Sequence, residues 1–94
     1  MIARIRKRDG RYVKFNEEKI LEAIQKAVIA VEAEVTVNRV NKITKEVVKR
    51  VEETTPEGRV PTVEYVQDVV EEVLMLSKLP EVAKAYILDR KSVV

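Results

Sequence analysis

The chain has 94 residues, of which 46% are hydrophobic and 36% charged, a composition that suits one globular domain with a strongly charged surface. It contains no cysteine and no histidine, which excludes a disulfide framework, thiolate catalysis and zinc sites of the usual kind. The net charge of +2 does not by itself indicate nucleic acid, and because charges interrupt every apolar run we expect a cytoplasmic protein without a signal peptide or membrane span.

A β-hairpin is predicted over residues 2–15. Apolar and charged residues alternate before Asp9-Gly10, a dipeptide typical of tight hairpin turns, and Val13 and Phe15 share one face after it. Residues 1–14 hold six Lys or Arg side chains and one Asp. Exposed hairpins often carry cations that discourage edge pairing, so this composition leaves two interpretations open, a solvated edge and an anion site.

Two amphipathic helices are expected next, over about residues 17–33 and 37–53, because their apolar residues recur at spacings of three and four. Asn16 is the expected N-cap of the first, where the carboxylates of Glu17 and Glu18 suit the helix dipole, and Thr36 is the expected cap of the second. The residues expected to face the core are Ile20, Ala23, Ile24, Ala27, Val28 and Val31, then Val37, Val40, Thr44, Val47, Val48 and Val51.

Two further helices are predicted over about residues 63–77 and 80–91. They follow a loop, residues 52–61, that contains a glycine and two prolines. Thr62 is the expected N-cap of the third helix, and Pro80 suits the first position of the fourth. Residues 1–94 are therefore predicted to form one α+β domain, a hairpin packed on a four-helix bundle. The expected core residues here are Val66, Val69, Val70, Val73 and Leu74, then Val82, Ala83, Tyr86 and Ile87.

Three cations near the junction of the hairpin and the first helix are candidates for binding an anion. Lys7 shares the predicted strand face of Ile5, which should point toward the helices, so its ammonium group requires an anion nearby. Lys19 lies in the first turn of a helix, where a cation opposes the dipole. A local pair with Glu22 or a snorkelling side chain explains Lys19 taken singly. Together with Lys7 and Arg8, it suggests cations that converge on phosphate.

No catalytic centre is predicted. With two glycines in the chain there is no Gly-rich phosphate loop, so phosphate would have to bind side chains or a helix N-terminus such as the one capped by Thr62. A purely structural cap is the simpler interpretation of Thr62, and a core position is the simpler interpretation of Tyr86. The third helix is expected to carry a solvated acidic face rather than a metal site, formed by Glu64, Asp68, Glu71 and Glu72.

Four segments together resemble the ATP-cone domain found at the N-terminus of ribonucleotide reductases. They are IRKRDG at residues 5–10, FNEEKI at 15–20, PTVE at 61–64 and EVAKAYILDR at 81–90. The resemblance extends over about residues 2–91. It implies a β-hairpin lid over a four-helix bundle that is not an enzyme but senses ATP or dATP, with magnesium accompanying the nucleotide.

The resemblance also implies roles for individual residues. Lys7, Arg8 and Lys19 would contact the phosphates, with Lys91 near them, and Asn16 would hydrogen-bond the base or shape its site. Thr62 would lie near the base or ribose. The apolar walls around adenine would be Ile5, Phe15 and Ile20. The implied partners are a ribonucleotide reductase catalytic domain or subunit, whose activity or assembly the module controls, and further copies of the module itself.

Two other functions are compatible with the residues. A nucleic-acid-binding or transcription-regulatory module would use the basic hairpin to follow a phosphate backbone, but one Phe and three Tyr offer few rings for base stacking. A structural helical module would leave the lysines merely solvated. The sequence itself does not decide between a regulatory domain excised from a reductase and a stand-alone one.

Overall fold

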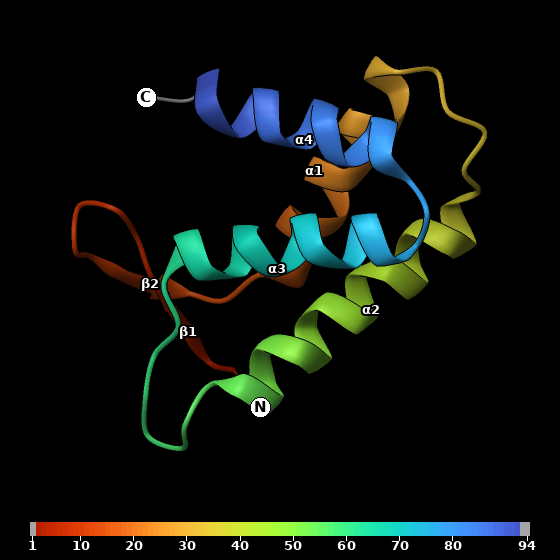
Figure 1. The fold of residues 1–94 in the computed structure, drawn as a ribbon. Helices are drawn as coiled ribbons and strands as arrows, with labels where there is room; N and C mark the ends of the chain where they lie inside the picture. The colour runs from red at the N-terminus through yellow and green to blue at the C-terminus, as the bar shows by residue number, and fades with distance from the viewer. Residues whose placement is uncertain (1, 93–94) are drawn as a thin grey trace.

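The computed structural model describes residues 2–92, with side chains as far as Arg90. An antiparallel hairpin precedes four helices (Figure 1), which confirms the predicted α+β fold with a hairpin and a helical bundle. Within residues 2–92, no helix is both long and apolar enough to cross a membrane. The elements are β1 (Arg4–Arg6), β2 (Tyr12–Lys14), α1 (Glu17–Ala30), α2 (Val37–Thr54), α3 (Val63–Leu76) and α4 (Pro80–Ser92).

The hairpin is shorter than the sequence pattern suggested. Ile5 lies opposite Val13, and both are half-buried, while their strand neighbours are exposed. Lys7 lies just beyond β1, and its side chain lies on the side of Ile5 as expected, since both residues line one cavity against the helices. Its N–H donates to the carbonyl of Arg11 at 2.8 Å, and its own carbonyl accepts from Gly10 at 2.9 Å. Gly10 has a φ of 89°, a conformation that costs glycine little.

The start of α3 is attached to the hairpin by a backbone contact that the sequence did not predict. The N–H of Arg6 donates to the carbonyl of Pro61 at 3.0 Å, and Arg6 forms an isolated parallel bridge with Thr62. The residues that follow β1 therefore lie next to the first turn of α3. This contact places the turn of the hairpin beside that helix.

The predicted N-caps are confirmed for α1, α2 and α3. The side chain of Asn16 accepts from the N–H of Glu18 at 3.0 Å. The hydroxyls of Thr36 and Thr62 each accept, at 3.1 Å, from the N–H of the residue three positions later in the chain. Each cap satisfies one of the N–H groups that a helix start leaves unpaired. These sequence signals therefore located the helix starts to the residue.

The ends of α1 and α3 lie before the predicted residues 33 and 77. Glu32 (φ 52°) and Lys78 (φ 60°) adopt the left-handed conformation. After each of them an N–H reaches back five residues, from Ala33 to the carbonyl of Val28 and from Leu79 to that of Leu74, both at 3.0 Å. This is the Schellman pattern, which usually has glycine at the left-handed position. Because neither helix has a glycine at this position, the sequence pattern placed the ends of both helices too late.

The core lies among the four helices. α1 packs on α2 and α4, and α3 packs on the same two helices. The residues predicted to be buried in α3 are all buried, but Val37, predicted to face the core, is 60% exposed because it begins α2 before the helix meets its neighbours. Ile43, which the prediction omitted, is buried. Ile24, Val47, Val51 and Leu74 have no exposed area.

Candidate functional site

A cavity of about 720 Å³ lies between the hairpin and the helices. This volume is in the range of small-molecule sites. Its lining comes from the hairpin and from α1, α3 and α4, so it exists only when the hairpin is packed on the bundle. The lining residues are Ile5, Lys7, Val13, Lys14, Phe15, Asn16, Lys19, Ile20, Ala23, Val63, Val66, Gln67 and Tyr86.

The cavity is positively charged. Three lysines, Lys7, Lys14 and Lys19, belong to its lining, which includes no Asp or Glu among the residues that the structure describes. The local pair between Lys19 and Glu22 is not among the ion pairs of the described side chains. Because Lys19 also lies near the N-terminus of α1, this part of the cavity favours an anion by side-chain charge and by the helix dipole together.

The cavity also has an apolar wall. Ile5 from β1, Phe15 beyond β2 and Ile20 from α1 contribute to it, and the three residues pack with the hydrophobic core. Tyr86 lines the cavity from α4, with only 7% of its surface exposed. Burial raises the pKa of Tyr86 to about 12, so the phenol stays neutral at physiological pH and retains its O–H donor.

Asn16 lies where the charged and apolar parts meet. Its side-chain oxygen is occupied by the cap of α1, where it accepts from the N–H of Glu18. The amide NH₂ group is therefore the part of this side chain that remains to donate to a ligand. The same residue thus begins the helix and lines the cavity.

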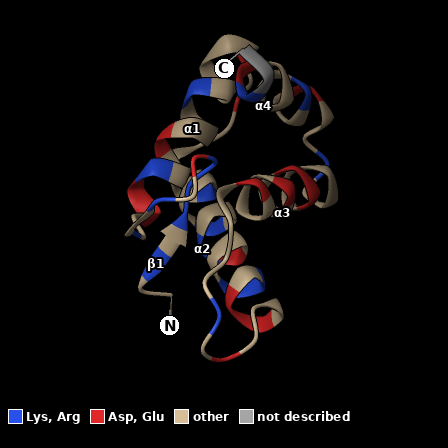
Figure 2. Cartoon of the chain, turned by 90° about the vertical axis from the view of Figure 1, so that its left-hand side faces the viewer, with Lys and Arg blue, Asp and Glu red and all other residues tan. Residues whose placement is uncertain are grey.

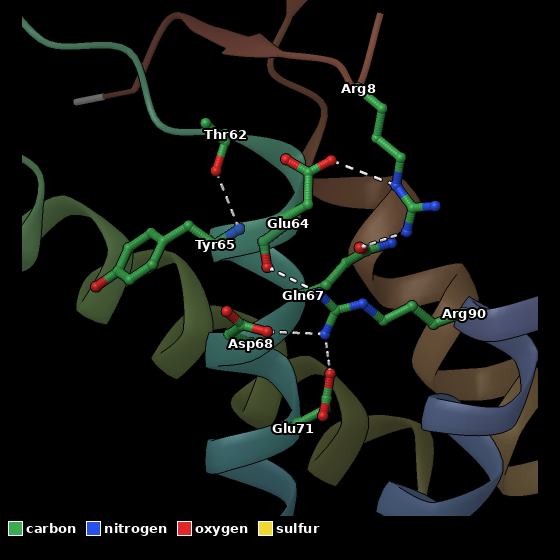
Figure 3. Close-up of polar contacts among 8 residues, drawn as sticks. All are labelled: Arg8, Thr62, Glu64, Tyr65, Gln67, Asp68, Glu71 and Arg90. Atoms are coloured by element: carbon green, nitrogen blue, oxygen red, sulfur yellow. Dashed lines mark hydrogen bonds and ion pairs between the residues drawn. The ribbon is translucent and has the colours of Figure 1, made fainter.

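Six of the predicted site residues line this one cavity, and two other described ones, Arg8 and Thr62, do not. The six are Ile5, Lys7, Phe15, Asn16, Lys19 and Ile20. The hydroxyl of Thr62 accepts from the N–H of Tyr65 and caps α3, so the structure uses it as a cap. Arg8 contacts α3 instead: its Nε lies 3.3 Å from a carboxylate oxygen of Glu64, and its guanidinium donates to Gln67 at 3.5 Å (Figure 3). The side chain of Lys91 lies outside the described residues.

The acidic face of α3 is paired rather than merely solvated, which corrects the expectation from sequence. Figure 2 shows red bands along α3 and blue on β1. Arg90 of α4 donates to Asp68 at 2.9 Å and to Glu71 (Figure 3). Glu72 accepts from Arg50 of α2 at 3.1 Å. No group of three or more carboxylates suited to a metal ion occurs among the described residues.

Arg90 forms the contact between α4 and α3 that sequence reasoning missed. Its side chain is only 18% exposed, and it also donates to the backbone carbonyl of Glu64 at 3.3 Å. Partial burial alone would lower the pKa of Arg90, but the hydrogen bonds to Asp68 and Glu71 raise it above its usual value. The i, i+3 spacing of Asp68 and Glu71 indicates that the two carboxylates can accept from one cation. Helical periodicity does not show which residue of α4 supplies that cation, because it does not give the register between α3 and α4.

A second hollow of about 500 Å³ lies on another part of the surface, between the N-terminal residues and the loop that joins α2 to α3. Arg4 and Arg59 line it together with Glu52 and Glu57. The charges of its lining therefore largely compensate one another. This hollow therefore attracts an anion much less strongly than the lysine-lined cavity does.

Comparison with known proteins gives consistent matches. The model of the ATP cone domain matches residues 3–92. The chain is 41% identical to the vitamin B12-dependent ribonucleoside-diphosphate reductase of Thermoplasma acidophilum over 96 residues, covering 97% of this chain. It is 38% identical to ribonucleoside-diphosphate reductase subunit alpha of Chlamydia pneumoniae over 92 residues, covering 89% of this chain. The chain spans 12% of the first relative and 9% of the second.

Proposed function

This chain belongs to the ATP-cone family, and from that premise we propose that its lysine-lined cavity binds ATP or dATP and that the domain regulates a ribonucleotide reductase. One observation carries the proposal: a single cavity combines three lysines, no described carboxylate and an apolar wall. A nucleoside triphosphate has the matching parts, a polyanion and a flat apolar base. The domain then acts by binding rather than by catalysis.

The phosphates are proposed to lie at Lys7 and Lys19. These residues come from the hairpin turn and from the first turn of α1, so a triphosphate between them joins the hairpin to the bundle. Arg8 follows Lys7 and reaches the same phosphates once it leaves its partners on α3. Lys91 is proposed to contact the phosphates as well. Ammonium and guanidinium groups make the strongest hydrogen bonds that proteins offer to phosphate oxygens.

The base is proposed to pack against Ile5, Phe15 and Ile20, which form the apolar part of the lining. The NH₂ group of Asn16 then donates to a ring nitrogen of adenine. Thr62 is proposed to lie near the base or ribose, although its hydroxyl accepts the capping hydrogen bond from Tyr65.

Magnesium is proposed to arrive with the nucleotide. No described carboxylate lines the cavity, so the described part of the chain supplies no hard anionic ligand there. Mg²⁺ commonly keeps several water ligands and takes the others from nucleotide phosphates. The ion would supply charge neutralisation of the triphosphate, while the lysines of this chain position it.

The partners are proposed to be a reductase catalytic domain or subunit and further copies of this domain. The relatives are named as reductases. Arg39 donates to the carbonyl of Ser77 at 2.6 Å, which brings the start of α2 to the end of α3. Val37, Met75 and Leu76 are each more than half exposed at these helix ends, and they offer apolar area for such contacts.

Nucleic acid is the second candidate ligand, supported by the outer face of the hairpin. Arg4 lies over the ring of Tyr12 at 5.3 Å, and Arg6 and Lys14 are exposed on the same face. Oligonucleotide binding there would be strongly weakened by salt. Of these residues Lys14 also lines the cavity, so ATP would compete with an oligonucleotide for that lysine.

Calorimetric titration with ATP, dATP and ADP, in magnesium and at two salt concentrations, tests the proposed function. We expect saturable binding of both triphosphates and weaker binding of ADP, because ADP lacks one phosphate for the lysines. At a free ATP concentration of 100 times its Kd, binding should also raise the free energy of unfolding by about 2.7 kcal/mol. Absence of heat and of any shift in Tm with ATP would refute nucleotide binding by this chain.

A further inference from the structure

Arg8 is held by α3 although the residue before it lines the cavity. Its Nε lies 3.3 Å from Glu64, and a terminal nitrogen lies 3.5 Å from the side-chain oxygen of Gln67, which itself lines the cavity (Figure 3). The guanidinium is therefore at the rim of the proposed phosphate site but is occupied by a carboxylate. We propose that Glu64 competes with the nucleotide phosphates for Arg8 and so lowers triphosphate affinity, an inference that rests on the proposed function.

A change of partner by the Arg8 side chain does not require the strand pairing of the hairpin to break. The pairing of β1 with β2 ends at Arg6, whose backbone is fixed by the hydrogen bond to Pro61. Arg8 lies in the turn beyond that point, and its side chain is 52% exposed. A rotation of its side chain toward Lys7 thus leaves the backbone hydrogen bonds of the strands intact.

Glu64 is held by α3 through its backbone. It lies in the first turn of the helix, where the helix dipole stabilises a carboxylate, and its backbone carbonyl accepts from Arg90 at 3.3 Å. One carboxylate oxygen of Glu64 is buried and has no hydrogen-bond partner among the described groups, although the ion pair with Arg8 compensates its charge. Removal of Arg8 therefore leaves this oxygen poorly satisfied.

The competition gives the ligand a differential contact between two states, which any regulation by a ligand requires. In the free domain Arg8 is bound to α3, and in the complex it is bound to phosphate. Glu64 is connected through its carbonyl to Arg90, which also binds Asp68 and Glu71 (Figure 3). The exchange therefore changes the charge beside the contact between α3 and α4. By linkage, any change that stabilises the Arg8–Glu64 pair weakens triphosphate binding by the same free energy that the triphosphate takes from the pair.

The test is calorimetric titration of ATP into the Glu64→Gln variant. Glutamine keeps the shape of the side chain but loses the charge, so ATP affinity should increase about 2- to 5-fold, the range expected from an ion pair as exposed as this one. Glu72→Gln is the matched control, because it removes one charge from the same helix at a residue that pairs with Arg50 instead. It should change ATP affinity less than Glu64→Gln does.

The Arg8→Ala background separates competition from direct repulsion. If Glu64 acts by holding Arg8, Glu64→Gln should no longer tighten ATP binding once Arg8 is absent. Tightening that persists in that background, or equal tightening by Glu72→Gln, would overturn the proposal while leaving nucleotide binding intact. So would unchanged affinity of Glu64→Gln. Failure of the unsubstituted chain to bind ATP would instead overturn the proposed function and this inference together. Circular dichroism of each variant confirms that it is folded.

Discussion

Alanine at Lys7 or at Lys19 is expected to weaken ATP binding by about 10- to 100-fold, which corresponds to the loss of one charge-assisted hydrogen bond to phosphate. The two side chains line the cavity from different elements, so each is expected to contribute separately to ATP binding. Calorimetry at one salt concentration gives the two affinities. The loss should be smaller for ADP than for ATP wherever the terminal phosphate is the group contacted.

Thermal unfolding separates this effect from misfolding. Lys19 opposes the dipole of α1, so Lys19→Ala should not lower the Tm of the free domain, and alanine favours the helix. Lys42→Ala is the control for loss of one positive charge, because Lys42 is exposed on α2 and does not line the cavity. If both cavity variants bind ATP as tightly as the Lys42 variant does, the lysines do not hold the phosphates.

The second large effect is expected on stability, from Arg90→Ala. The substitution removes the hydrogen bonds to Asp68 and Glu71 and leaves the half-buried carboxylate of Glu71 without this partner. Because Arg90 is only 18% exposed, we expect the free energy of unfolding to fall by about 2 kcal/mol. In a domain of this size that lowers the Tm by roughly 8–16 °C.

Arg90→Lys is the informative comparison, since lysine keeps the charge but cannot form the planar fork of hydrogen bonds. It should recover only part of the stability, as measured by thermal denaturation followed by circular dichroism. A Tm within about 2 °C of the unsubstituted value for Arg90→Ala would show that the contact between α3 and α4 depends on apolar packing alone.

The helices were predictable from sequence because their signals are local. Apolar spacing and the caps at Asn16, Thr36 and Thr62 depend on residues a few positions apart. The ends of α1 and α3 were predicted less well, because Glu32 and Lys78 take the left-handed conformation without the glycine that usually marks it. Tertiary packing stabilises these two ends, and local propensity does not report it.

The site was predictable to the extent that its residues are near one another in the chain. Ile5, Lys7, Phe15, Asn16, Lys19 and Ile20 belong to one continuous segment, and folding a hairpin onto the next helix brings them to one cavity. The contributions of α3 and α4 were harder to foresee. Gln67, Tyr86 and the partners of Arg8 depend on how distant helices pack, and neither periodicity nor charge spacing sets that register.

The most direct test of where the nucleotide binds is NMR titration of the isotope-labelled chain with ATP and magnesium. Nucleotide in the lysine-lined cavity should shift the amide signals of residues 5–20 and 63–67, with saturation at a defined stoichiometry. Residues 52–61, which line much of the second hollow, should change little. Shifts confined to residues 52–61, or no saturable shifts at all, would contradict a nucleotide site between the hairpin and the bundle.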